Sequence, residues 1–129
     1  MGNNEIMESQ ESAPFCPYYH RAVELIGRRW TGAILRALLS GVERFSDLTQ
    51  TVPGLSDRML SERLKELEAE GIVLRTVIPA TPVRIEYHVT AKGRALASVV
   101  EAVSGWAEEW LVRPAEAPPE PDTTASRRR

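Results

Sequence analysis

Five side chains suited to contacts with a nucleic acid lie near the start of one predicted helix, Ser56 to Glu70. They are Ser56, Arg58, Met59, Ser61 and Lys65. Hydroxyl and basic groups near a helix N-terminus can meet phosphate oxygens and base edges in a DNA groove. The solvated outer face of an ordinary bundle helix has a similar composition, and Arg58 could instead form an i,i+4 ion pair with Glu62. Both interpretations are open on this segment alone.

Cys16 is a second centre of candidate chemistry, and it is the only cysteine. A thiol reacts as its thiolate, which is favoured just before a helix N-terminus and beside cations such as Arg21 or a protonated His20. The alternative is an inert small side chain packed under the first helix. Because no disulfide can form within the chain, a sensing reaction would involve a second chain or a small electrophile or oxidant.

Metal and enzyme chemistry find little support in the sequence. His20, His88 and Cys16 have a spacing that matches no common metal site, and no cofactor is predicted. A thiol enzyme built on Cys16 and His20 would need a supporting acid or an oxyanion-hole motif, and neither is visible. We therefore expect a protein that is not an enzyme and that carries no metal or cofactor.

Two helices joined by a tight turn are predicted to position the polar face. Ser46 and Ser56 are the expected N-caps, and Pro53-Gly54 ends the first helix. In the second helix the buried face repeats at i, i+4 and i+7, as Leu60, Leu64 and Leu67. A short helix, a turn and a longer helix with a polar outer face form the helix-turn-helix arrangement.

A β-hairpin is predicted directly after these helices. Gly71 closes the second helix, residues 72–78 are rich in β-branched side chains, and Pro79 to Pro82 forms a turn. Apolar and polar residues then alternate over residues 83–89, which indicates a half-buried strand. A hairpin in this place is a wing, and Arg84 is predicted to reach the minor groove of DNA or its backbone.

Further helices flank this centre. One starts at Pro17 and ends near Gly27, and the next runs from about Trp30 to Leu39 with Trp30 as a core anchor. Thr90 is expected to cap the last helix, whose apolar face is wider than a domain of this size needs. Aromatic residues are enriched at interfaces, so a dimer is preferred over folding back onto the first helix. The predicted interface residues are Tyr18, Val99, Val103, Trp106 and Trp110.

Length and composition predict one domain, residues 16–112, between a flexible arm over 1–15 and a disordered tail over 113–129. No run of 18 apolar residues and no secretory signal is present, and the single cysteine fits the cytoplasm. The formal net charge is −2, but residues 21–94 carry 12 Lys and Arg against 9 Asp and Glu. The modest basic excess thus lies in the part that would face phosphates.

Taken together, these motifs resemble the HxlR-type winged helix-turn-helix regulators of bacteria. The resemblance covers about Cys16 to Leu111 and is carried by Cys16-Pro17, Leu25-Ile26-Gly27-Arg28-Arg29-Trp30, Arg44-Phe45-Ser46-Asp47-Leu48, Leu60-Ser61-Glu62-Arg63-Leu64-Lys65-Glu66-Leu67, Gly71-Ile72-Val73, Pro82-Val83-Arg84-Ile85-Glu86-Tyr87, Val89-Thr90 and Lys92-Gly93. It implies a mainly α fold with a small β-hairpin wing, and a homodimer paired through its first and last helices. It also implies operator binding with the Ser56–Glu70 helix in the major groove. In that family a cysteine at the position of Cys16 often senses electrophiles or oxidants.

We therefore expect a DNA-binding transcriptional regulator, most simply a repressor, that binds a pseudo-palindromic operator as a homodimer. A response to oxidants or electrophiles through Cys16 is part of this expectation. The alternative is a winged-helix module that binds protein without specific DNA binding. Salt-dependent binding to the protein's own promoter would separate these two classes.

Overall fold

A computed structural model describes residues 13–112 of the chain. The predicted flexible arm, apart from residues 13–15, and the predicted disordered tail lie outside this range. The chain divides into two compact units, Met1–Ala95 and Leu96–Arg129. No helix among the described residues combines the length and apolar character that crossing a membrane requires.

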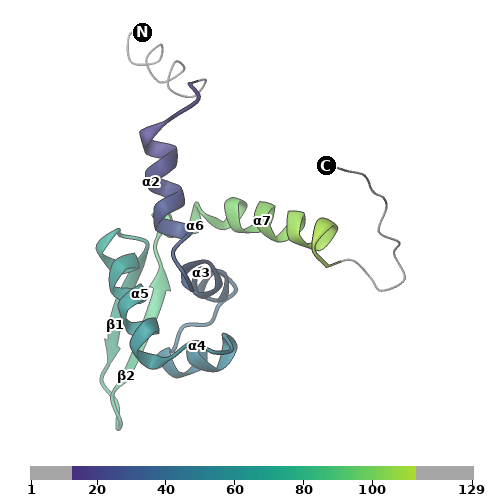
Figure 1. Ribbon diagram of the computed structural model, residues 1–129. Helices are drawn as coiled ribbons and strands as arrows, with labels where there is room; N and C mark the ends of the chain where they lie inside the picture. Colours follow the sequence, from purple (N-terminus) through teal and green to yellow (C-terminus); the bar gives the residue numbers. More distant parts are fainter. Residues whose placement is uncertain (1–12, 113–129) are drawn as a thin grey trace. The chain divides into compact units, whose positions relative to one another are not determined.

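The first unit contains a group of helices followed by a β-hairpin (Figure 1). Its elements are α2 (Pro17–Ile26), α3 (Thr31–Leu39), α4 (Phe45–Thr51), α5 (Asp57–Ala69), β1 (Val73–Ile78), β2 (Arg84–Val89) and α6 (Ala91–Arg94). The described part of the second unit is formed mainly by α7 (Ala97–Trp110). This order confirms the predicted fold class, a mainly helical winged helix-turn-helix.

The core of the first unit lies where α3, α4 and α5 meet the start of the hairpin. Its largest fully buried apolar side chains are Ile34, Leu35, Leu48, Leu60, Leu64, Leu67 and Ile72. The three predicted leucines of α5 are among them, which confirms that face of the helix. Helices that pack around a shared apolar core in this way hold α5 in a fixed orientation.

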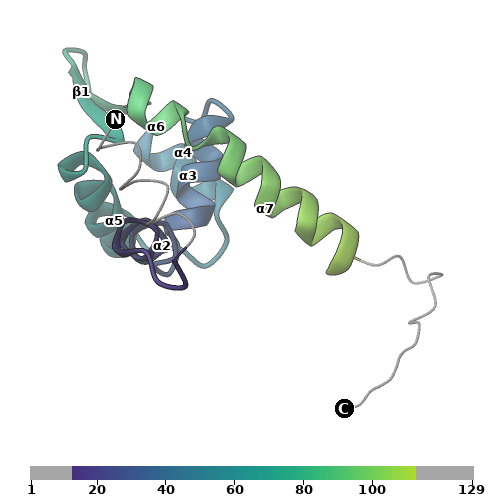
Figure 2. The same cartoon turned by 90° about the horizontal axis from the view of Figure 1, so that it is seen from above.

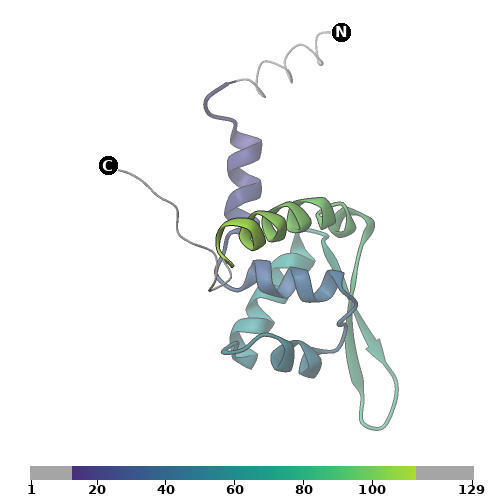
Figure 3. The same cartoon turned by 90° about the vertical axis from the view of Figure 1, so that its right-hand side faces the viewer.

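The hairpin pairs β1 and β2 antiparallel, with a register that runs from Val73 opposite Val89 to Ile78 opposite Arg84. It projects beyond α4 and α5, with its connecting loop at the far end (Figures 1 and 3). Seen from above, it stands at one side of the helix group (Figure 2). This is the geometry of the predicted wing.

The N-terminus of α4 differs from the prediction that Ser46 caps it. The helix begins at Phe45, and the capping position is Arg44, which has extended backbone angles and gives no side-chain cap. Arg44 forms an isolated antiparallel bridge with Glu86 of β2. Because that bridge keeps the chain extended through Arg44, the helix starts one residue after it and Ser46 falls within the first turn.

The prediction that Thr90 caps the last helix is also wrong. Thr90 caps the short helix α6, where its Oγ1 accepts a hydrogen bond from the Gly93 N–H at 3.1 Å. Ala95 and Leu96 stay in the helical region but with ψ of −16° and −4°, and α7 begins at Ala97. These ψ values are less negative than those of a regular α-helix, so they interrupt the regular helical hydrogen bonding. Gly93, a weak helix former, lies just before the break.

Trp30 is not the buried core anchor that its place in the apolar stripe predicted. Its side chain is only partly buried, and its backbone has a φ of 77° at the N-cap of α3. The stripe is instead formed by Ile34, Leu35 and Leu38, which are all buried. The Arg29 guanidinium lies 5.2 Å from the centroid of the Trp30 ring, which is within the range of a cation–π contact.

Candidate nucleic-acid interface

The helix α5 is anchored at its start by the predicted cap. The Ser56 Oγ accepts a hydrogen bond from the Met59 N–H at 3.1 Å, which satisfies one of the free donors of the first turn. The turn before it needs a left-handed residue, and Gly54 supplies one with a φ of 84°. A side chain at Gly54 would also approach the ring of Trp30, at 3.4 Å from Cη2 to the added Cβ.

The outward face of α5 carries the predicted polar residues. Ser56, Arg58 and Lys65 are exposed, whereas Met59 and Ser61 are half-buried. Arg58 is 89% exposed and lies 3.5 Å from Glu62, so the predicted i,i+4 pair is present. An exposed pair of this kind contributes little to stability, so it leaves Arg58 available for a phosphate or a base.

The inward face of α5 contains one charged residue that sequence analysis did not single out. Arg63 is 7% exposed, and its Nε donates to the Arg29 carbonyl at 2.9 Å. Its Nη1 donates to Glu66 Oε2 at 3.1 Å, and Glu66 also lies 3.1 Å from Arg28. The guanidinium therefore ties α5 to the segment between α2 and α3. The position of Arg63 in the sequence among the buried leucines Leu60, Leu64 and Leu67 was the signal that could have predicted its burial.

The wing brings Arg84 to the first position of β2. The guanidinium Nε lies 3.1 Å from Glu86 Oε2, and 41% of the Arg84 side chain is exposed. A solvent-open hollow of about 650 Å³ lies between this part of the wing and the start of α4. Its lining includes Phe45, Ser46, Val83 and Arg84.

Cys16 is a free, half-buried cysteine at the N-cap of α2. Its backbone carbonyl accepts the His20 N–H at 2.9 Å, which is the first bond of the helix. The His20 ring lies 5.5 Å from the ring of Phe15. Arg21, predicted as a nearby cation, forms an ion pair with Glu70, the C-cap residue of α5, at 3.1 Å.

The residues predicted for a dimer interface all expose apolar surface. Tyr18 of α2 is 69% exposed, and in α7 the exposed fractions are 39% for Val99, 62% for Val103, and 57% each for Trp106 and Trp110. No residue of α7 is buried. Large exposed apolar side chains on one helix are typical of surfaces that a partner covers.

Together, a helix with a buried inner face and a polar outer face, a tight turn before it and a hairpin after it define a winged helix-turn-helix protein. Residues 25–115 match the family model described as HxlR-like helix-turn-helix. The chain therefore belongs to the HxlR-like helix-turn-helix family and is a DNA-binding transcriptional regulator.

Two curated relatives from Bacillus subtilis (strain 168) agree. The chain is 53% identical over 96 residues to the uncharacterized HTH-type transcriptional regulator YvaP, covering 74% of this chain and 89% of YvaP. It is 45% identical over 95 residues to the HTH-type transcriptional regulator YodB, covering 74% of this chain and 85% of YodB. Both relatives are transcriptional regulators by name.

Solved structures show the same fold. The reduced form of YodB aligns with a TM-score of 0.66 and 45% identity, covering 74% of this chain and 94% of that one. The diamide-treated form of YodB aligns with a TM-score of 0.64 and 44% identity, covering 76% of this chain and 97% of that one. The quinone-bound form aligns with a TM-score of 0.64 and 41% identity, covering 74% of this chain and 100% of that one. The redox regulator HypR in its reduced form aligns with a TM-score of 0.67 and 34% identity, covering 70% of this chain and 90% of that one.

Proposed function

We propose that the protein is a cytoplasmic, homodimeric repressor that binds a pseudo-palindromic operator and responds to oxidants or electrophiles through Cys16. It acts by binding and not by catalysis. The observation that carries the DNA-binding part is the division of α5 into two faces. Leu60, Leu64 and Leu67 are buried, while Arg58 and Lys65 point away from that core.

In this proposal the outer face of α5 enters the major groove. Ser56, Arg58, Met59, Ser61 and Lys65 contact base edges and phosphates there. Arg84 meets the backbone or the minor groove beside the recognition helix. Its pair with Glu86 is partly exposed, so the guanidinium can exchange that carboxylate for a phosphate.

The homodimer is formed by α2 and α7, through Tyr18, Val99, Val103, Trp106 and Trp110. The exposed apolar surface of these side chains supports this pairing. Two winged helices related by a twofold axis read half-sites whose centres are one helical turn, or a multiple of it, apart. A pseudo-palindromic operator follows from that symmetry.

The sensing step is supported by the relatives and by the chemistry of one thiol. YodB has been solved in diamide-treated and quinone-bound forms, and HypR is described as a redox regulator. Cys16 is the only cysteine of the chain, so its oxidised product is a disulfide to a second chain or to a small thiol. A quinone would instead add directly to the sulfur. Either change adds bulk beside α2 and alters the spacing of the two recognition helices.

The test is a footprint of the protein on its own promoter with and without diamide or a quinone. We expect a two-half-site footprint on duplex DNA that weakens steeply with added salt, and that changes on treatment in wild type but not in Cys16→Ser. A single half-site saturated by a monomer would refute the dimeric operator. Unchanged affinity with the thiol modified, as shown by mass spectrometry, would leave Cys16 a structural residue.

The readout residues are tested on matched specific and random duplexes. Arg58→Ala is expected to lower discrimination between them by about 1–3 kcal/mol if Arg58 reads a base edge.

Arg84→Ala is expected to weaken binding to both duplexes alike if Arg84 meets phosphate. If Arg84 enters the minor groove, binding to sites with A/T-rich flanks is weakened preferentially. If the wild-type protein shows no salt-dependent binding to its own promoter, a module that binds protein is favoured instead.

A further inference from the structure

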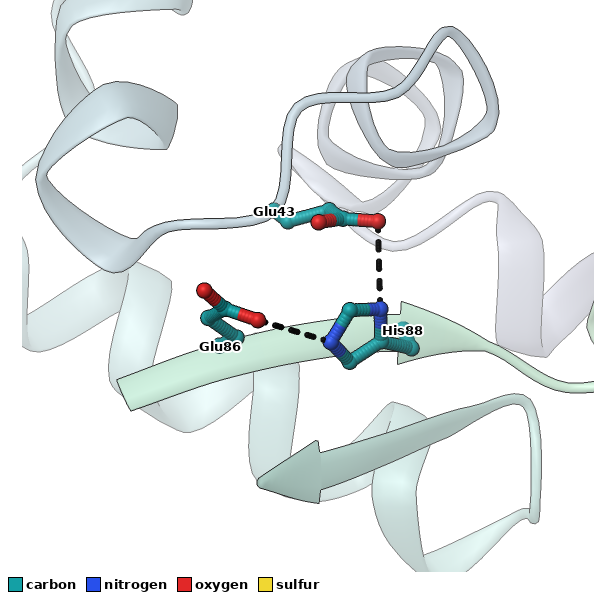
Figure 4. Close-up of side chains that lie close together, drawn as sticks. All are labelled: Glu43, Glu86 and His88. Atoms are coloured by element: carbon teal, nitrogen blue, oxygen red, sulfur yellow. Dashed lines mark hydrogen bonds and ion pairs between the residues drawn. The ribbon is translucent and has the colours of Figure 1, made fainter. Parts of the chain in front are cut away.

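Three side chains capable of binding a metal converge where the wing joins the helix-turn-helix (Figure 4). Glu86 and His88 lie two residues apart on β2, so they share one face of the strand. His88 Nε2 lies 3.0 Å from Glu86 Oε1, and His88 Nδ1 lies 3.1 Å from Glu43 Oε2. One ligand atom from each of the three residues lies within 4.8 Å of the other two.

Backbone hydrogen bonds hold these residues in place. The Tyr87 N–H donates to the Glu43 carbonyl at 2.8 Å, and Arg44 forms an antiparallel bridge with Glu86. The segment before α4 therefore runs along β2 like a short third strand. Glu43 is brought to the histidine by this pairing and not by a flexible loop.

The carboxylate of Glu86 is itself oriented by a neighbour. Arg84 Nε lies 3.1 Å from Oε2, which leaves Oε1 directed at His88. Carboxylate ligands of metal ions are commonly fixed by such an outer hydrogen bond. Glu43, by contrast, is exposed, and its carboxylate has room to rotate.

A solvent-open hollow of about 520 Å³ gives access to the carboxylates. Its charged lining residues are Glu43, Asp47 and Glu86 with one cation, Arg44, so the lining carries an excess of negative charge that attracts a cation. One imidazole and two carboxylates form a nitrogen and oxygen donor set that suits zinc and similar divalent transition metals. Three protein ligands leave a fourth position for water.

We propose that Glu43, Glu86 and His88 bind a divalent transition-metal ion of the zinc type. His88 supplies one ring nitrogen, and each carboxylate supplies one oxygen. Tetrahedral zinc needs its ligand atoms about 3.3 Å apart, since its bonds to nitrogen and oxygen are about 2.0–2.2 Å. Rotation of the exposed Glu43 side chain toward the nitrogen that faces Glu86 closes the site. The bound ion would then link the base of the wing to the segment that leads into α4.

The competing account is a histidine that only hydrogen-bonds to two carboxylates. It predicts the same distances but no stoichiometric metal. It also predicts that a glutamine at position 43, which can still hydrogen-bond to His88, behaves like wild type. A carboxamide is a much weaker zinc ligand than a carboxylate, so the two accounts differ for this variant.

The experiment uses the full chain carrying Cys16→Ser, so that the thiol and His20 cannot form a separate thiolate site. Zinc is titrated against a chromophoric chelator, and melting is followed with and without zinc. We expect one zinc per chain, at least tenfold weaker binding in Glu43→Gln and His88→Gln, and a rise in melting temperature with zinc that these variants lack. His20→Gln is the matched histidine control and should bind as the parent does.

Far-UV circular dichroism without zinc checks that each variant is folded. If His88→Gln does not fold, Glu43→Gln alone provides the test, because Glu43 is exposed. Less than one zinc per chain in the parent would overturn the proposal. So would parental affinity in a folded Glu43→Gln variant. Neither result depends on operator binding, so this proposal and the proposed function fail independently.

Discussion

The helices α5 and α7 are of similar length and both carry a row of apolar residues, yet they use it differently. Within α5, Leu60, Arg63, Leu64 and Leu67 are buried against the first unit. No residue of α7 is buried, although its sequence is the more apolar of the two. Helix α5 completes its packing within one chain, so its polar face is held rigidly outward. The apolar surface of α7 leads us to expect a second chain there.

The largest expected effect separates the two helices by their role in folding. Leu64→Ala in α5 removes a side chain that is 1% exposed. We expect a loss of about 2–5 kcal/mol in the free energy of unfolding, because transfer and cavity terms add. Urea unfolding followed by circular dichroism measures it. Val103→Ala, at a 62% exposed site of α7, is the matched control, and an equal loss in unfolding of the monomer would contradict the distinction.

The next effect concerns association and not folding. Trp106→Ala in α7 should weaken dimerisation by about 2 kcal/mol or more, roughly thirtyfold, if this tryptophan is a central interface contact. Sedimentation equilibrium over a range of concentrations measures the dissociation constant. Val83→Ala removes an apolar side chain of similar exposure from the hairpin loop and should leave dimerisation unchanged. A monomeric wild type would remove the dimer from the proposal.

A smaller effect is expected for the buried guanidinium of α5. Arg63→Ala should cost about 1–3 kcal/mol, because the part-buried Arg29 carbonyl loses its donor, whereas Glu66 is 36% exposed and keeps its pair with Arg28. Thermal unfolding measures the change. The matched control is Arg58→Ala on the exposed face, for which we expect less than about 0.5 kcal/mol. Equal losses would mean that the inner face of α5 is not anchored by Arg63.

Most of the fold follows from local sequence signals. The spacing of Leu60, Leu64 and Leu67, the Pro53-Gly54 turn and the alternation along β2 each predict the element that forms. These signals act within one or two turns of a helix or along a single strand, so a sequence shows them directly. They also placed the polar face of α5 on the outside.

The failures arise where distant segments meet or where one residue takes an unexpected backbone conformation. Ser46 has the chemistry of a cap, but the bridge from Arg44 to Glu86 sets the start of α4. Trp30 continues an apolar pattern, but its left-handed backbone takes the residue out of the helix. The grouping of Glu43 with Glu86 and His88 depends on the same pairing across the chain. Only the alternation of Glu86 and His88 on one strand face was visible in advance.

The smallest effect distinguishes the true cap of α5 from the serine that only resembles one. Ser56→Ala removes the oxygen that accepts the Met59 N–H, and we expect a loss of about 1 kcal/mol in the free energy of unfolding. Ser46→Ala removes a hydroxyl that gives no cap to α4, so the loss should stay within about 0.5 kcal/mol. Neither variant changes a buried side chain, so the slope of the urea transition should be the same in both. The urea midpoints of the two variants can then be compared directly. Because the cap fixes the first turn of α5, Ser56→Ala should also loosen the backbone beside Arg58 and Met59. Faster amide hydrogen exchange of the first turn in Ser56→Ala, and not in Ser46→Ala, would place the loss at that turn. Equal losses in the two serine variants would show that α5 is held by its buried leucines alone.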